Sequence, residues 1–335
     1  MRIIFVILAV LLVVPGWSAE ERGARVTPGL RIVTSRVALD PDDPTRVTLG
    51  GLRYLGGIRL NGDARSFGGF SALAVRGERF MLLSDGGLVL RFTLGADWRL
   101  RNVRWHALPG GPRTGWDKRD RDSESLVVDA AADRAWIGFE SANAIWRYSA
   151  ELGRVDAIVA PRAMRDWRSN GGAESLARLD DGRFVAIAEA SRVAARDWRG
   201  SEAARRRTRE MIIFARDPLA GGAVGRAAYL PTESHHVVDA VAVPGGDLLV
   251  LERAFRLPYR FANRIMRVAA RDLAAGKVIR GRAIAALAPP LIHDNFEGMA
   301  ITREGGATIL WLVSDDNQSM LQRTLLLKFA LEEAR

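Results

Sequence analysis

Acidic side chains recur at one position of a repeated sequence pattern. Glu124, Glu174, Asp239 and Glu297 each open an apolar run of strand length, and Ser71 opens a fifth such run. A second acidic residue closes the run that follows each of these: Asp85, Glu140, Glu189, Glu252 and Asp315. In an antiparallel pair the start of one strand lies beside the end of the next. We therefore expect both acidic sets at one end of the fold.

Further oxygen donors cluster around the same positions: Asp122, Asn143, Asn170, Asp294, Asn295, Asp316 and Asn317. So many converging carboxylates repel one another unless their charge is compensated. A hard divalent cation held by several oxygens would compensate it, and calcium is the expected ion. Pairing with arginines such as Arg253, or hydrogen bonds from loop amides in a purely structural role, are alternatives.

The chemistry that these residue types support is metal-assisted hydrolysis. The predicted metal ligands are both acidic sets: Glu124, Glu174, Asp239, Glu297, Asp85, Glu140, Glu189, Glu252 and Asp315. The predicted catalytic residues are Glu174, Glu297, His293 and Arg253, with Arg253 stabilising anionic charge.

Three of the four histidines fall near the acidic positions. His235 and His236 precede Asp239, and His293 precedes Glu297. His236 or His293 would serve as a general base or metal ligand. A surface histidine without chemistry is the alternative, and His106 is expected to be structural.

The elements that position these residues are short β-strands. From Ser71 through Glu124, Glu174 and Asp239 to Glu297 the repeat steps are 53, 50, 65 and 58 residues, and each unit holds three or four β-rich runs. This period is typical of propeller blades. The last unit ends after its third run, whereas residues 52–60 supply a strand before the first unit. We predict an all-β propeller of five blades, closed by N- and C-terminal strands that share a blade; strands within residues 30–50 leave six blades as the alternative.

The first residues have the pattern of an export signal. Arg2 precedes an apolar run from Ile3 to Pro15, which is too short for a comfortable membrane span. The predicted organisation is a signal peptide over residues 1–19, an N-terminal extension over 20–45 and a single propeller over 46–335. A monomer in the periplasm or outside the cell is expected, without a stable membrane span after cleavage; an uncleaved N-terminal anchor is the alternative.

Composition excludes several classes of function. There is no cysteine, so disulfide frameworks, zinc-thiolate sites and cysteine nucleophiles are ruled out. The net charge is +10, but the arginines are dispersed and not interleaved with aromatic residues, which argues against nucleic-acid binding. Ser71 lacks the glycine pattern of a nucleophile elbow. The arginine-rich stretch 191–209 is either a solvated loop or a lid that recruits an anionic substrate.

Several motifs resemble one family. Phe67-Gly-Gly-Phe-Ser-Ala-Leu, Leu83-Ser-Asp-Gly-Gly, Asp122-Ser-Glu-Ser-Leu, Gly172-Ala-Glu-Ser-Leu and Asn295-Phe-Glu-Gly-Met are similar to the phytase-like propeller domain, described as esterase-like activity of phytase. The resemblance covers roughly residues 50–331. It implies an exported, calcium-dependent propeller that hydrolyses phosphate or other esters. With only three lysines in the chain, arginines would have to hold the phosphate.

We therefore expect an exported, metal-assisted ester or phosphoester hydrolase that acts at an acidic funnel on a small, anionic substrate. The alternatives are a non-catalytic binding propeller of the cell envelope and a calcium-dependent, lactonase-like enzyme.

Overall fold

The computed structural model describes residues 26, 29–114, 120–257 and 260–332. The predicted signal peptide lies outside the described residues. Among the described residues no helix is long and apolar enough to cross a membrane.

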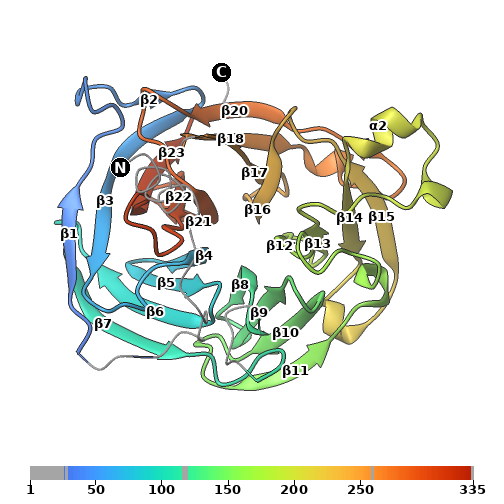
Figure 1. Ribbon diagram of the computed structural model, residues 1–335, viewed down its shortest axis with the longest axis horizontal. Coiled ribbons are helices and arrows are strands. Elements are labelled where there is room, and N and C mark those ends of the chain that lie inside the picture. The colour runs from blue at the N-terminus through green and yellow to red at the C-terminus, as the bar shows by residue number, and fades with distance from the viewer. Residues whose placement is uncertain (1–25, 27–28, 115–119, 258–259, 333–335) are drawn as a thin grey trace, which may run out of the picture.

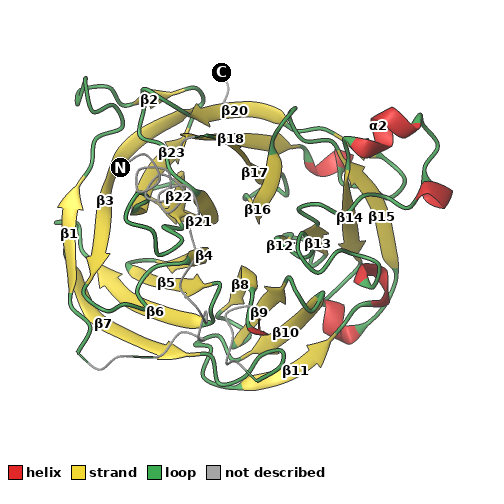
Figure 2. Cartoon of the chain, viewed as in Figure 1, coloured by secondary structure: helices red, strands yellow, loops and turns green. Residues whose placement is uncertain are grey.

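Five antiparallel sheets surround a central axis as the blades of a propeller (Figure 1), and strands dominate over a few short helical turns (Figure 2). Blade 1 consists of β4 (Phe70–Arg76), β5 (Arg79–Ser84), β6 (Leu88–Leu94) and β7 (Leu100–Ala107). Blade 2 consists of β8 (Ser123–Asp129), β9 (Arg134–Phe139), β10 (Ala144–Tyr148) and β11 (Val155–Val159). The first strand of each blade is innermost and lines the central channel.

Blade 3 contains β12 (Ser175–Arg178), β13 (Phe184–Ile187), β14 (Arg209–Phe214) and β15 (Val224–Tyr229), with the short β19 (Val278–Ile279) added in parallel at its outer edge. Blade 4 contains β16 (His236–Ala242), β17 (Leu248–Arg256), β18 (Arg260–Val268) and β20 (Arg282–Leu287). The arginine-rich segment 191–209, expected to be either a solvated loop or a lid, lies between β13 and the start of β14 and includes the helix α2 (Glu202–Arg206).

Blade 5 closes the ring with both ends of the chain. β21 (Phe296–Glu304), β22 (Ala307–Ser314) and β23 (Thr324–Leu331) are followed in the sheet by β3 (Leu52–Gly62). β23 and β3 pair over eight positions from Thr324↔Leu60 to Leu331↔Leu52. The predicted five blades and their shared closing blade are confirmed, because this pairing satisfies backbone groups that would otherwise form two open edges.

The segment expected as an N-terminal extension takes part in this blade. β1 (Ile32–Arg36) pairs with β3 at the outer edge, and β2 (Thr48–Leu49) forms a hairpin with β3. Leu39, which lies between β1 and β2 in the sequence, is fully buried in the cluster of blades 4 and 5, and its carbonyl accepts a hydrogen bond of 2.8 Å from the amide of Ile292. Residues 30–50 thus add strands to blade 5 instead of building a sixth blade.

The hydrophobic core lies between neighbouring blades. Leu249 and Leu251 of blade 4 pack with Leu327 and Phe329 of blade 5 in one cluster, and all four side chains are fully buried. The equivalent cluster between blades 2 and 3 contains Trp136 and Phe184. Strand residues alternate between two faces, so the near-continuous apolar runs of the second strands supply both neighbouring interfaces. Rigid face-to-face packing of this kind fixes where the inner strands begin.

Candidate metal and catalytic site

The inner strands of three blades begin with a β-bulge. The ladder between the first two strands skips one residue, which is Ser71 in blade 1, Glu124 in blade 2 and Glu297 in blade 5. A bulge leaves one residue unpaired and re-aims its side chain. The predicted inner acidic position of blades 2 and 5 is therefore a bulge position at the mouth of the ring.

Blade 4 departs from the sequence repeat by one residue. Its bulge residue is Val238, and Asp239 is already paired with Leu251. At the neighbouring position His236 pairs with Arg253, so Arg253 stands where blades 1, 2 and 5 carry Asp85, Glu140 and Asp315. The prediction that Asp239 and Glu252 occupy the repeated acidic positions of blade 4 is therefore wrong: Val238 and Arg253 occupy them. The packing of the apolar residues sets the register of the strands, and the acidic residues do not.

Asp239 and Glu252 bind the protein's own groups. The Asp239 carboxylate accepts hydrogen bonds from the amides of Ala240 (2.7 Å) and Met299 (2.6 Å), and therefore joins the inner strands of blades 4 and 5. Burial raises the pKa of Asp239 well above its usual range, against the opposing effect of these amides. Glu252 is fully buried and accepts hydrogen bonds from the Tyr229 hydroxyl (2.7 Å) and the Thr232 amide (3.0 Å). Both residues have a structural role in this arrangement.

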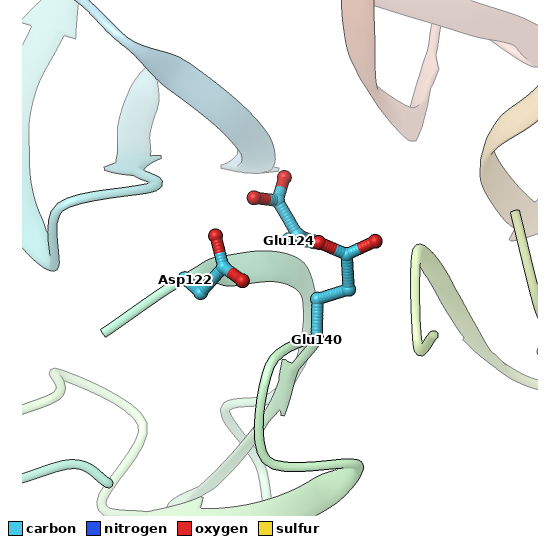
Figure 3. Close-up of side chains that lie close together, drawn as sticks. All are labelled: Asp122, Glu124 and Glu140. Carbon is cyan, nitrogen blue, oxygen red and sulfur yellow. The ribbon is translucent and has the colours of Figure 1, made fainter. Parts of the chain in front are cut away.

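Three carboxylates of blade 2 converge at the mouth. Oxygens of Asp122, Glu124 and Glu140 all lie within 4.8 Å of one another (Figure 3). Asp122, anticipated only as an additional oxygen donor, adopts a left-handed backbone conformation with φ +40°, where the matching residue of blade 1 is Gly69 with φ +67°. Such a conformation costs a non-glycine residue roughly 1 kcal/mol. The chain thus carries a carboxylate at a position that favours glycine.

Burial and mutual repulsion act on these groups together. Burial raises the pKa of Glu140 to about 8, with a further contribution from Asp122 and an opposing one from the amides of Gly171 and Gly172. The Glu140 carboxylate accepts hydrogen bonds from both amides. Burial, then Glu174 and Glu297, raise the pKa of Glu124 well above its usual range. The sequence-predicted carboxylates of blades 2, 3 and 5 therefore lie close enough to influence one another.

Glu174 extends the carboxylate group into blade 3. It lies one residue before β12, and its pKa is raised well above the usual range by burial first, then by Glu189 and Glu140. Asp85 of blade 1 also adds to the repulsion at Glu124. The main-chain turn at Gly69 lies against Asp85, because a Cβ at this glycine would be 2.9 Å from Asp85 Oδ1.

Arg253 supplies the compensating positive charge. Its guanidinium donates to Glu297 and to Asn295 Oδ1 (2.7 Å), and its Nη2 lies 3.9 Å from Glu189 Oε1. Burial opposes its charge, but Glu297, Glu174 and Glu189 together raise the pKa of Arg253. Predicted catalytic residues Glu174, Glu297 and Arg253 are thus brought into one electrostatic group.

The histidines are less closely joined to this group. His236 Nδ1 is 3.6 Å from Glu189 Oε1, and burial lowers the pKa of His236 despite that carboxylate. His293 Nδ1 lies 2.7 Å from the carbonyl of Leu291, and the His293 carbonyl accepts from Arg323. Among the described residues no ion pair joins His293 to the acidic cluster. Asp315 accepts a hydrogen bond from the Asn317 amide (2.6 Å) within its own loop.

A small basic cavity adjoins the mouth on the side of blades 3 and 4. It has a volume of about 230 Å³, and its lining includes Arg206, Arg207, Arg209, His235 and His236. Arg209 also donates to the main-chain carbonyl of Glu189, which links the cavity wall to the carboxylates. Arg209 thus brings the end of the arginine-rich segment against Glu189.

The donor chemistry of Asp122, Glu124 and Glu140 fits a hard divalent cation. All three offer carboxylate oxygens, which calcium and magnesium prefer. A bound cation would also relieve the repulsion and burial that raise their pKa values. The set contains no nitrogen or sulfur donor, so it does not resemble a zinc site.

Comparison with known proteins identifies the family of the chain. The model of the phytase-like family, described as esterase-like activity of phytase, matches residues 65–318. No curated protein matches the sequence. Among solved structures, the WD40 beta propeller domain of Doa1 is 12% identical with a TM-score of 0.39, and the match covers 84% of this chain and 76% of that one. Hydrazine synthase of Kuenenia stuttgartiensis is 15% identical with a TM-score of 0.37, over 73% of this chain and 64% of that one.

Proposed function

The chain belongs to the phytase-like family, and on that premise we propose that it is an exported, metal-assisted hydrolase of small anionic esters or phosphoesters. The observation that carries the proposal is the cluster of Asp122, Glu124 and Glu140, whose carboxylate oxygens lie within 4.8 Å of one another. Family membership alone does not fix a reaction, and each proposed role rests on the side chains of this chain.

Asp122, Glu124 and Glu140 would hold a divalent cation, with calcium the expected ion. When bound, the cation would polarise the ester and increase the acidity of a coordinated water. Glu140 is anchored for this role by the amides of Gly171 and Gly172.

Glu174 and Arg253 would act on the substrate itself. Burial raises the pKa of Glu174 well above its usual range, which favours the protonated form, and the carboxyl would donate this proton to a leaving oxygen. Arg253 is oriented by Glu297 and Asn295, and its guanidinium would stabilise negative charge as it develops. Glu297 is then a positioning residue for Arg253.

An anionic substrate is supported by the neighbouring basic cavity and by the net charge of +10. Arg206, Arg207 and Arg209 bring several guanidinium groups to the edge of the carboxylate site. Guanidinium groups bind carboxylate and phosphate oxygens through paired hydrogen bonds. Export to the periplasm or outside the cell, as a monomer, completes the proposal.

The test begins with metal binding. Calorimetric titration of chelator-treated protein with Ca²⁺ should show binding that is lost in Glu124→Gln and Glu140→Gln. Glu78→Gln is the matched control, because Glu78 lies in the exposed turn between β4 and β5, at the other end of the inner strand. Equal Ca²⁺ binding by all variants would refute the assignment of ligands.

Turnover is then measured on p-nitrophenyl phosphate, p-nitrophenyl acetate and a lactone, with and without chelator. We expect Glu174→Gln to reduce kcat by roughly 100-fold or more, as for the loss of a general acid, while Ca²⁺ affinity is retained. Protein that binds Ca²⁺ but turns over none of these ester classes would support the non-catalytic binding propeller instead.

A further inference from the structure

The central channel holds a second cavity, at the end opposite the carboxylate mouth. Its volume is about 790 Å³, and all five inner strands contribute to its lining: β4, β8, β12, β16 and β21. The contributing residues come from the middle and the far ends of these strands, and Asp122, Glu124 and Glu140 are not among them. From the channel the cavity extends outward between blades 1 and 2, along β6 and β7 of blade 1 and the turn at Glu151.

The charge of this cavity is opposite to that of the acidic mouth. Five arginines line it: Arg76, Arg79, Arg91, Arg104 and Arg178. Arg91 pairs with Glu151, and Arg178 Nη1 lies 3.5 Å from Asp129 Oδ2. Among the described residues Arg76, Arg79 and Arg104 form no ion pair, and all three are exposed. The remaining acid in the lining, Asp239, accepts hydrogen bonds from main-chain amides.

These arginines stand opposite one another in blade 1. Arg76 is the cross-strand partner of Arg79 between β4 and β5, and Arg91 is the partner of Arg104 between β6 and β7. Like charges directly opposite in a sheet destabilise it. Glu151 offsets the second pair, whereas among the described residues no ion pair offsets the first.

Apolar side chains form the rest of the wall. Ala74 and Met81 of blade 1 line it and pack in the cluster between blades 1 and 2, on the same face of the blade as the arginines. Leu126 and Val128 of blade 2 are only partly buried and also line it. A concave cavity that combines apolar surface with a few convergent charged groups is the usual form of a small-molecule site, and the volume of this one falls within the usual range.

We propose that this cavity binds a small amphiphilic anion, a medium-length alkyl chain carrying a carboxylate or phosphate head group. The alkyl chain would lie against the apolar wall of the channel, and Arg76, Arg79 and Arg104 would hold the head group. This site is separate from the carboxylate mouth, and its occupancy does not depend on hydrolysis there. The carboxylate mouth would hold a cation, and this cavity would hold an anion at the opposite end of the channel.

The test uses the anionic fluorophore 1-anilinonaphthalene-8-sulfonate as a probe on the folded protein, displaced by decanoate or by decyl phosphate. The triple variant Arg76→Gln, Arg79→Gln, Arg104→Gln should lose roughly tenfold or more in affinity for both competitors. A matched triple variant removes three exposed arginines elsewhere on the surface: Arg165, Arg216 and Arg282, each replaced by Gln. It keeps the net charge equal to that of the first variant and should retain binding.

A chain-length series tests the apolar wall. Affinity should rise by roughly fourfold for each methylene added from butyrate to decanoate, and inorganic phosphate should displace the probe only weakly. The stronger competitor of decanoate and decyl phosphate identifies the head group. The proposal is overturned if the probe does not bind, if both triple variants lose affinity equally, or if inorganic phosphate competes as well as decyl phosphate.

Discussion

Neutralising Glu140 should make the metal-free protein more stable near neutral pH. The carboxyl is almost completely buried, and its pKa rises from 4.5 to about 8. For an acid whose pKa is raised by folding, the stabilising effect of its proton is complete below pH 4.5. That effect is lost as the pH rises towards 8, because the unfolded chain releases the proton first. Glu140→Gln fixes the neutral form and keeps an oxygen that can accept from Gly171 and Gly172.

The magnitude follows from the pKa difference. At about 1.4 kcal/mol per pH unit, the shift is worth about 5 kcal/mol above pH 8, and about 3 kcal/mol at pH 7, where the folded carboxyl is still mostly protonated. Because neighbouring side chains relax, we expect a gain of about 1–3 kcal/mol at pH 7. The variant and the native protein should have equal stability near pH 4.

The assay is urea denaturation in chelator at pH 4, 5.5, 7 and 8.5, with Glu78→Gln as the control. Saturating Ca²⁺ should make the native protein more stable than Glu140→Gln. A ligand at 100 times its Kd adds about 2.7 kcal/mol to the free energy of unfolding of the native protein, and it should add less to a variant that lacks one carboxylate. A Glu140→Gln protein that is no more stable than the native protein at pH 7 in chelator, with an unchanged pH profile, would refute the electrostatic reasoning.

Two further substitutions test other parts of the site and of the ring closure. Arg253→Leu should lower the free energy of unfolding by about 2–4 kcal/mol in chelator, because Glu297 is left without its cation. Adding Glu297→Gln to that variant should restore part of the lost stability, because it removes the unpaired charge. A double variant no more stable than Arg253→Leu would show that Glu297 does not depend on Arg253 for charge compensation. Gly68→Ala should lower stability by about 1–3 kcal/mol, since a Cβ there would lie 2.2 Å from Asp316 Oδ1 in blade 5 at φ +112°. Gly77→Ala is the control, because Gly77 also has a positive φ (+58°) but a Cβ there would have no neighbour within 4 Å. Equal melting temperatures for the two variants would show that the close contact between Gly68 and Asp316 does not contribute to stability.

The repeat determined the fold from the sequence alone. Apolar runs of strand length recurred in the same order in five units, and one strand was missing at the C-terminus where residues 52–60 offered one. Sheets cannot leave such edges open without risk of aggregation, so closure by β3 and β23 could be predicted. The gathering of Glu124, Glu174 and Glu297 at one mouth followed from the antiparallel order of the strands.

Tertiary structure decided the register of blade 4 and the charge at each end of the central channel. In sequence Asp239 and Glu252 continue the acidic series, yet the bulge at Val238 places Arg253 in the carboxylate group and gives the two acids to main-chain amides and Tyr229. A shift of one residue exchanges the two faces of a strand, and only the packing between blades fixes that shift. The cavity at the far end could not be predicted either, because four of its five arginines lie on successive strands of blade 1 and line a cavity only where the blades come together.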